Sequence, residues 1–151
     1  MTTYYAREVL DSDSDNGTMP NNVAALEEVL VGQRIVKVEK NVTIRDRWGS
    51  EEIGTVIHLS NGQIVKMVNT NDCCAYTDLE AFLLHPDRVD HMIMGVGTTD
   101  GYRTWHIFAD AGDVLELTVN WSCGNPFYYG YGFDISVEGD RLLIIDEEPE
   151  L

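Results

Sequence analysis

The sequence predicts a β-rich α+β fold, an antiparallel meander of about seven or eight strands with two short helices. Short runs of β-branched and aromatic residues follow one another through turns of Gly, Asn and Asp. Only two stretches carry helical signals, and strands do not alternate with helices as they would in a parallel sheet. The length of 151 residues and the apolar content of 44% fit a single domain with its own core, over residues 1–151.

The first helical signal follows an acidic N-terminal segment, residues 1–20. Its central part, residues 11–18, is rich in Asp, Ser, Asn and Gly and has nothing to bury, so we expect this segment to be mobile. We expect Asn21 or Asn22 to cap the helix and Gly32 to follow its end. The apolar stripe of this helix would comprise Val23, Leu26, Val29 and Leu30.

The second helical signal is a capping box, in which Thr77 is followed by Glu80. Pro86 would stop a helix that begins there, so the pattern predicts a helix of about two turns. Its apolar stripe would comprise Leu79, Phe82 and Leu83.

The clearest strand signal is a hairpin around Asn61 and Gly62, between apolar runs at residues 53–59 and 64–68. Asn-Gly is the preferred pair for a two-residue type I′ turn, which needs a positive φ at both positions. Both runs carry apolar residues on both faces, which favours a sheet that is covered on each side. Residues 36–44 fit either a strand pair or one bent strand. Further strands are expected at residues 92–96, 102–109, 114–121, 131–137 and 142–145.

The net charge of −16 is distributed unevenly. Residues 34–67 hold six Lys or Arg against four acids, whereas residues 68–139 hold eleven acids against two Arg. Residues 140–151 form an acidic tail. Most of this surface would repel a phosphate backbone, so we expect no direct nucleic-acid binding. The acidity fits solubility in a crowded cytosol, and it also fits attraction to a basic partner or mimicry of nucleic acid.

We expect a cytoplasmic protein. No apolar run approaches the ~20 residues that a membrane-spanning helix needs, so we expect no contact with a membrane. The first residues show no secretory signal, and the three cysteines form no disulfide pattern.

Cys73, Cys74 and Cys123 are the most obvious candidates for chemistry. Zinc sites usually show two cysteines separated by two to four residues, and adjacent cysteines do not offer that spacing. We therefore interpret all three as free structural thiols, with one of the adjacent pair buried against the second predicted helix, and we expect neither a metal nor a cofactor. A mixed site would need the fold to gather the histidines, which are His85, His91 and His106.

Aromatic residues gather in the second half of the chain. In residues 102–109 and 114–121 alternate side chains share a face, so one row of each strand is expected in the core. Residues 124–132 combine many aromatics with several glycines, which fits either a core plug under a long loop or a binding surface. The candidate binding residues are Trp105, Trp121, Asn125, Phe127, Tyr128, Tyr129 and Tyr131.

The sequence contains no complete catalytic motif. It lacks a Gly-x-Ser-x-Gly motif, and residues 95–99 lack the Lys and the following helix of a phosphate-binding loop. Cys123 could pair with a histidine, but nothing in the sequence places the two together. Glu116 and Asp134 receive no special weight among 26 acidic residues. We therefore expect a protein that is not an enzyme.

Five motifs occur in order within residues 30–137. They are Asp72-Cys73-Cys74, Thr104-Trp105 with Phe108, Gly112 with Val114, Trp121, and the run from Asn125 to Tyr129. In this combination the chain resembles a family of small proteins of unknown function found in bacteriophages and bacteria, and it is most similar to the version frequent in phages of actinobacteria. The resemblance implies a phage-encoded accessory protein. It carries over no activity, cofactor or catalytic residue.

The leading hypothesis is a phage-type accessory protein of unknown function that binds a host protein or a small ligand, as a homo-oligomer and without catalysis. One alternative is a hydrolase that uses the cysteines with histidine or a metal ion. Another is sequestration of a nucleotide-like host signal, which would need a cationic pocket. The cationic cluster available for such a pocket comprises Arg34, Lys37, Arg45, Arg47 and Lys66.

Overall fold

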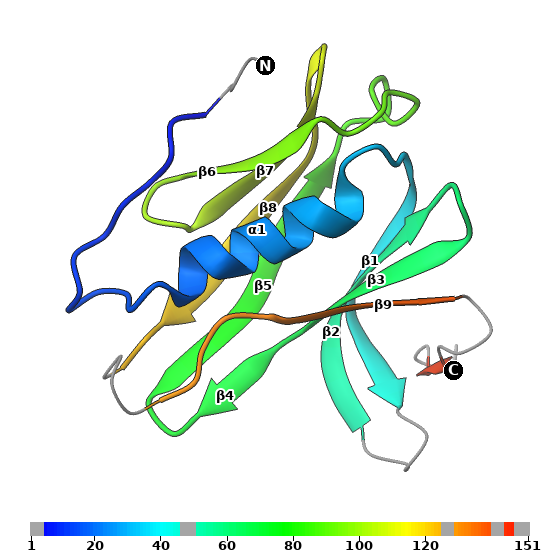
Figure 1. Ribbon diagram of the computed structural model, residues 1–151. Coiled ribbons are helices and arrows are strands. Elements are labelled where there is room, and N and C mark those ends of the chain that lie inside the picture. Colours follow the sequence, from blue (N-terminus) through cyan, green and yellow to red (C-terminus); the bar gives the residue numbers. More distant parts are fainter. Residues whose placement is uncertain (1–4, 46–50, 125–128, 140–143, 147–151) are drawn as a thin grey trace.

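Figure 1 shows the computed structural model, which describes residues 5–45, 51–124, 129–139 and 144–146. Within these residues the chain forms two five-stranded sheets and one helix, α1 (Thr18–Leu30). The β-rich antiparallel class predicted from the sequence is confirmed, but this part of the chain holds more strands than expected and one helix in place of two. No helix among the described residues is long and apolar enough to span a membrane.

The first sheet consists, in spatial order, of β10 (Ile144–Asp146), β1 (Ile35–Arg45), β2 (Glu51–Leu59), β3 (Gln63–Val68) and β9 (Asp134–Gly139). The second consists of β4 (Thr70–Asp72), β5 (Ala75–Leu84), β8 (Gly112–Ser122), β7 (Thr104–Ala109) and β6 (Gly95–Thr99). Asn69 alone separates β3 from β4, so the chain passes from one sheet directly into the other. β6 and β9 are edge strands.

The main core lies between the two sheets and α1, which contributes Met19, Leu26 and Leu30 to it. In β2, Val56 and Ile57 are both fully buried. Because neighbouring residues of a strand face opposite sides, this strand is covered on both faces, as its sequence indicated.

The helix α1 begins earlier than predicted, at Thr18, and neither Asn21 nor Asn22 caps it. The side chain of Asp15 accepts hydrogen bonds from the amide nitrogens of Gly17 (3.0 Å) and Met19 (3.1 Å). The acidic segment before the helix thus supplies the groups that satisfy its first turn. It also contacts the body of the protein, because Tyr131 donates its hydroxyl hydrogen to Asp15 (2.6 Å).

Two polar side chains of α1 bind the backbone of the two sheets. The Asn22 side chain accepts a hydrogen bond from Phe133 N and donates one to Phe133 O, both at 2.8 Å, just before β9. Glu27 accepts a hydrogen bond from Val96 N of β6 (2.9 Å). The helix therefore lies across the opening between two edge strands, where it binds the backbone of β6 and that of the residue before β9 (Figure 1).

The second predicted helix is wrong, because residues 75–84 form the strand β5. Thr77 and Leu79 are buried in it, and its register with β8 then shifts between Leu79 and Ala81. After this bulge Phe82, and not the exposed Ala81, packs against the core. The bulge thereby replaces the two-residue period of a strand with a spacing of three, which is the spacing that imitated a helix.

The Asn61-Gly62 hairpin is confirmed, but its turn is not a two-residue type I′ turn. Gly62 N donates to Leu59 O (3.0 Å), and Gly62 has a φ of 87° while Asn61 does not have a positive φ. This is a three-residue loop with glycine in the left-handed position. The Asn61 side chain accepts a hydrogen bond from Gln63 N (2.9 Å), which favours this alternative turn.

Residues 35–45 form one bent strand, β1, and not a strand pair. Its register with β2 shifts between Glu39 and Val42, and Asn41 has a φ of 56°. The bend therefore comes from a bulge around Asn41.

Replacing Asn22 with Ala should lower the free energy of unfolding by about 2–3 kcal/mol, because the Phe133 N–H and C=O groups lose their partner. Urea denaturation followed by circular dichroism measures this change. Asn21→Ala is the matched control, since Asn21 is the exposed neighbour in the same helix. Equal effects of the two substitutions would contradict the role given to Asn22.

Replacing Gly62 with Ala should cost about 1 kcal/mol of stability, because a positive φ strains an L-residue. A Cβ atom at Gly62 would meet nothing within 4 Å, so the cost would come from the backbone alone. Gly62→Asn should cost less, since Asn tolerates this conformation better. Thermal unfolding of the three proteins tests the order, and an unchanged melting temperature for Gly62→Ala would refute the turn.

Candidate functional site

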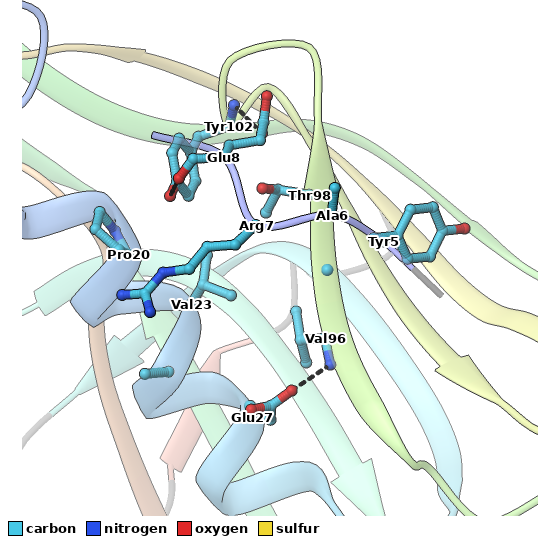
Figure 2. A pocket seen from close by; sticks show the side chains of 12 residues that line it. Tyr5, Ala6, Arg7, Glu8, Pro20, Val23, Glu27, Val96, Thr98 and Tyr102 are labelled. Atoms are coloured by element: carbon cyan, nitrogen blue, oxygen red, sulfur yellow. Dashed lines mark hydrogen bonds between the residues drawn. The ribbon is translucent and has the colours of Figure 1, made fainter. Parts of the chain in front are cut away.

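The N-terminal segment, residues 5–8, crosses the edge strand β6 and contacts two different sites (Figure 2). Tyr5 lies on Gly97, where a Cβ atom would come within 2.5 Å of the Tyr5 side chain. On the other side of β6, Arg7 extends toward α1, and Glu8 points to the turn that follows β6 (Figure 2). Glycine at position 97 therefore permits the close approach of the segment to the strand.

Glu8 fixes this segment to the turn between β6 and β7. Its carboxylate accepts hydrogen bonds from Gly101 N (2.7 Å) and Tyr102 N (2.9 Å), and Tyr102 donates its hydroxyl hydrogen to Glu8 O (2.6 Å). Tyr102 has a φ of 62°, a strained value for a bulky residue that these contacts hold in place. Burial raises the pKa of Tyr102, so its hydroxyl stays a hydrogen-bond donor.

A pocket of about 280 Å³ opens between the N-terminal segment, α1 and β6 (Figure 2). A second pocket of about 340 Å³ adjoins it and shares Arg7, Glu8, Pro20 and Tyr102 with it. We call the two together the trough. Its apolar lining comprises Ala6, Val9, Leu10, Pro20, Val23, Ala24 and Val96.

The polar groups of the trough fall into two classes. The carboxylates of Glu8, Asp15 and Glu27 are already hydrogen-bonded to backbone amides. In contrast, the guanidinium of Arg7 and the hydroxyl of Thr98 make no hydrogen bond or ion pair with any described residue, although Thr98 is only 5% exposed. Thr98 lies on β6 beside the N-terminal segment (Figure 2). The trough therefore offers two unused donor groups within an apolar lining.

A group of histidines and carboxylates lies on the outer face of the second sheet. His106 on β7 is directly opposite Glu116 on β8, and Phe108 is opposite Asp113. The register shifts between these two pairs, so Val114 is an extra residue in β8. Asp113 and Glu116 are three residues apart and would face opposite sides of a regular strand, but the bulge puts both on the side of His106.

We call His85, His106, Asp113 and Glu116 the histidine–carboxylate cluster. The Nδ1 atom of His106 lies 2.9 Å from Asp113 Oδ2, and the Nε2 atom of His85 lies 2.6 Å from Glu116 Oε2. Single ligand atoms of His106, Asp113 and Glu116 lie within 4.8 Å of one another. The side chains of His106 and Asp113 are 11% and 15% exposed, so the pair is largely shielded from water.

Tyr5 covers this cluster. Its ring stacks on His106 with centroids 4.2 Å apart and planes 16° from parallel, and its hydroxyl donates to Asp113 Oδ1 (2.6 Å). Burial and the Asp113 carboxylate raise the pKa of Tyr5, which keeps its proton in this bond. In the N-terminal segment, Tyr5 thus contacts the cluster, and all four residues line the trough.

The adjacent cysteines are not where the sequence predicted. Cys73 and Cys74 are both exposed and Cys123 is buried, so burial of one of the adjacent pair is wrong. The pair forms the tip of the β4–β5 hairpin, because the predicted helix that would have covered it is a strand. All three thiols are free, with the Sγ atoms of the pair 2.9 Å apart, and the hydrogen bond to Cys74 raises the pKa of Cys73. A raised pKa disfavours the reactive thiolate.

The described aromatic candidates lie mainly in the core. Trp105, Trp121 and Tyr131 are 0%, 5% and 7% exposed, and Trp121 stacks on Tyr131 at 5.8 Å. Tyr129 is half-buried, and hydrogen bonds to Cys74 and then Cys73 raise its pKa to about 12. Asn125, Phe127 and Tyr128 lie outside the described residues, so a binding role for this run stays a prediction.

The cationic residues that the sequence offered for a nucleotide-binding pocket do not form one cluster in the described structure. Arg34 donates to Asp90 O (2.9 Å), and Lys37 pairs with Glu39 (3.6 Å). Lys66 lies on β3, which β2 separates from β1. Arg47 and the side chain of Arg45 lie outside the described part of the chain.

Sequence reasoning named two members of the cluster and missed the others. His85 and His106 do come together, whereas the third histidine named, His91, pairs with Asp110 on the surface (2.9 Å). Asp113 was not considered, and Glu116 was set aside as one of 26 acidic residues. The odd spacing of these two residues in a strand gives no sign of a shared face. Arg7 and Thr98 were also missed, because they are far apart in sequence and carry no motif.

The comparison with known proteins identifies a family but no activity. Residues 28–135 match the family described as Domain of unknown function (DUF7448). No curated protein and no solved structure matches the chain. The matched range contains the histidine–carboxylate cluster and the β6 wall of the trough, whereas the N-terminal segment and most of α1 precede it. Because this range covers more than half of the sequence, the chain belongs to the DUF7448 family.

Proposed function

We propose that this protein binds a small carboxylic acid with an apolar body in the trough, and that it acts by binding and not by catalysis. The observation that carries this proposal is the guanidinium of Arg7, which has no partner among the described residues and lines the same pocket as Thr98, whose hydroxyl also makes no hydrogen bond with a described residue. A ligand carboxylate at this point could accept hydrogen bonds from both groups, and hydrogen bonds that involve charged groups are the stronger ones.

The lining of the trough suits an apolar ligand body. Pro20, Val23 and Ala24 form one wall and Val96 the other, with the ring of Tyr102 between them. Sites for small molecules are typically lined by apolar side chains with a few polar groups that fix the ligand's orientation. The trough follows this pattern.

The charges around the trough favour a single carboxylate over a phosphate. Arg7 is one cation, and Glu8, Asp15 and Glu27 lie in the same lining. A doubly charged phosphate would meet these three carboxylates and the net charge of −16. A carboxylate carries a single charge, and a guanidinium binds it through two parallel hydrogen bonds. Distant charges matter less, since salt screens them beyond about 8–10 Å.

The separation of the two sites supports binding without catalysis. The paired histidines and carboxylates of the cluster lie on the outer face of the second sheet, and none of the cluster residues lines the trough. The carboxylates that do line the trough are bonded to backbone amides. A general base must come within hydrogen-bond reach of the group it acts on. A phage-encoded accessory role remains a proposal that rests on the resemblance of the sequence. A host-protein partner has less support, because the described Trp candidates are buried in the core.

We expect decanoate to bind the full-length protein with one site, and decanol, which lacks the charge, to bind more weakly. Arg7→Gln should weaken decanoate binding by roughly 10–100-fold through loss of a charge-assisted bond, and Thr98→Val by up to about tenfold. Isothermal titration calorimetry gives both affinities.

Two substitutions serve as matched controls for this titration. Lys37→Gln removes an exposed cation on β1, and Thr118→Val removes an exposed hydroxyl on β8. Neither should change decanoate affinity. Equal binding of decanoate and decanol, or equal affinities for Arg7→Gln and Lys37→Gln, would refute the proposal. Capture of a host protein by a variant that no longer binds decanoate would favour the host-protein alternative.

A further inference from the structure

We propose that the histidine–carboxylate cluster is a binding site for a divalent transition-metal ion of the zinc class, with His106, Asp113 and Glu116 as ligands and His85 as the fourth. This site lies on the opposite side of the N-terminal segment from the trough, and its existence does not depend on the function proposed there.

The arrangement of the ligand atoms suits an ion. One atom each of His106, Asp113 and Glu116 lies within 4.8 Å of the other two. Two ligand atoms on a tetrahedral zinc ion are about 3.3 Å apart, so the ligand atoms need to move closer together by up to about 1.5 Å. The Nε2 atom of His85 is 2.6 Å from Glu116 Oε2 and can join them as the chain's fourth donor.

The charge of the cluster is the second observation. Asp113 and Glu116 bring two carboxylates together on a partly shielded face. No Lys or Arg in the described part of the chain pairs with either carboxylate, and the nearby Arg88 donates to the backbone oxygen of Asp113 (3.0 Å). Like charges this close are unfavourable, and a divalent ion would neutralise both.

Neighbouring residues already hold the ligands in the way a metal site requires. Thr99 Oγ1 lies 2.8 Å from His106 Nε2, which leaves Nδ1 for an ion, and Tyr5 binds the oxygen of Asp113 that does not contact His106. Metal-binding histidines usually bond through their second ring nitrogen, and such outer contacts orient the ligands. We therefore assign Thr99 and Tyr5 as positioning residues.

The donor set selects the class of metal. Two imidazoles with two carboxylates suit zinc, iron, cobalt and nickel ions, whereas magnesium and calcium prefer oxygen donors alone. The exposed Cys73 and Cys74 are an alternative soft site, which an experiment must separate from this one.

The test uses the full-length protein, stripped of metal with a chelator and titrated with ZnCl₂ by calorimetry and with CoCl₂ by visible absorption. We expect one ion per chain, a cobalt spectrum without thiolate charge-transfer bands, and no competition from excess Mg²⁺. Glu116→Gln and His106→Gln should each weaken zinc binding by more than about 100-fold, and Tyr5→Phe by roughly 10-fold.

Two controls keep the result decisive. His91→Gln alters the exposed His91–Asp110 pair, a matched histidine–carboxylate contact, and should leave affinity unchanged. The double substitution Cys73→Ser, Cys74→Ser should do the same. Glu116 is 32% exposed in its side chain, so Glu116→Gln should fold even if His106→Gln does not. Absence of zinc binding, binding that survives Glu116→Gln, or binding lost with the two cysteines would each overturn the proposal.

Discussion

The structure depends on how one helix satisfies two open sheet edges. Within the described residues neither β6 nor β9 has a further strand beside it, and exposed backbone groups on such edges tend to recruit other chains. The Asn22 side chain makes the hydrogen bonds to the Phe133 backbone that a neighbouring strand would otherwise make, and the Glu27 side chain does the same for the Val96 amide. While Asn22 and Glu27 bind these backbone groups, the apolar residues of α1 are buried in the core. The space left between the helix and β6 is the trough.

Bulges decide which side chains share a face in the second sheet. In β5 a bulge moves Phe82 to the core side, and in β8 a bulge moves Asp113 to the side of Glu116. Each adds one residue to one strand of a pair, so the two-residue alternation changes phase at that point. A bulge in β5 thus makes its sequence pattern resemble that of a helix, and a bulge in β8 brings the residues of the histidine–carboxylate cluster together.

These bulges explain what the sequence could and could not predict. The Asn61-Gly62 hairpin depends on neighbouring residues, so its position was predictable, but its turn type depends on a side-chain bond of Asn61 that the dipeptide does not specify. The choice between core and surface for Trp105 and Trp121 was left open, because strand period alone cannot say which face is covered. The cluster and the trough need contacts between distant residues, such as Tyr5 with Asp113, that no local pattern contains.

The N-terminal segment is where the two candidate sites meet. Tyr5 lies over His106, and Arg7 lines the trough only two residues later, because the segment crosses β6 between these two residues (Figure 2). Glu8 anchors this geometry through two backbone amides at the β6–β7 turn. The segment precedes the range that defines the family, whereas its contact surface, β6 and His106, lies within it. The family domain therefore supplies the rigid sheet, and residues 5–8 with α1 complete both sites on it.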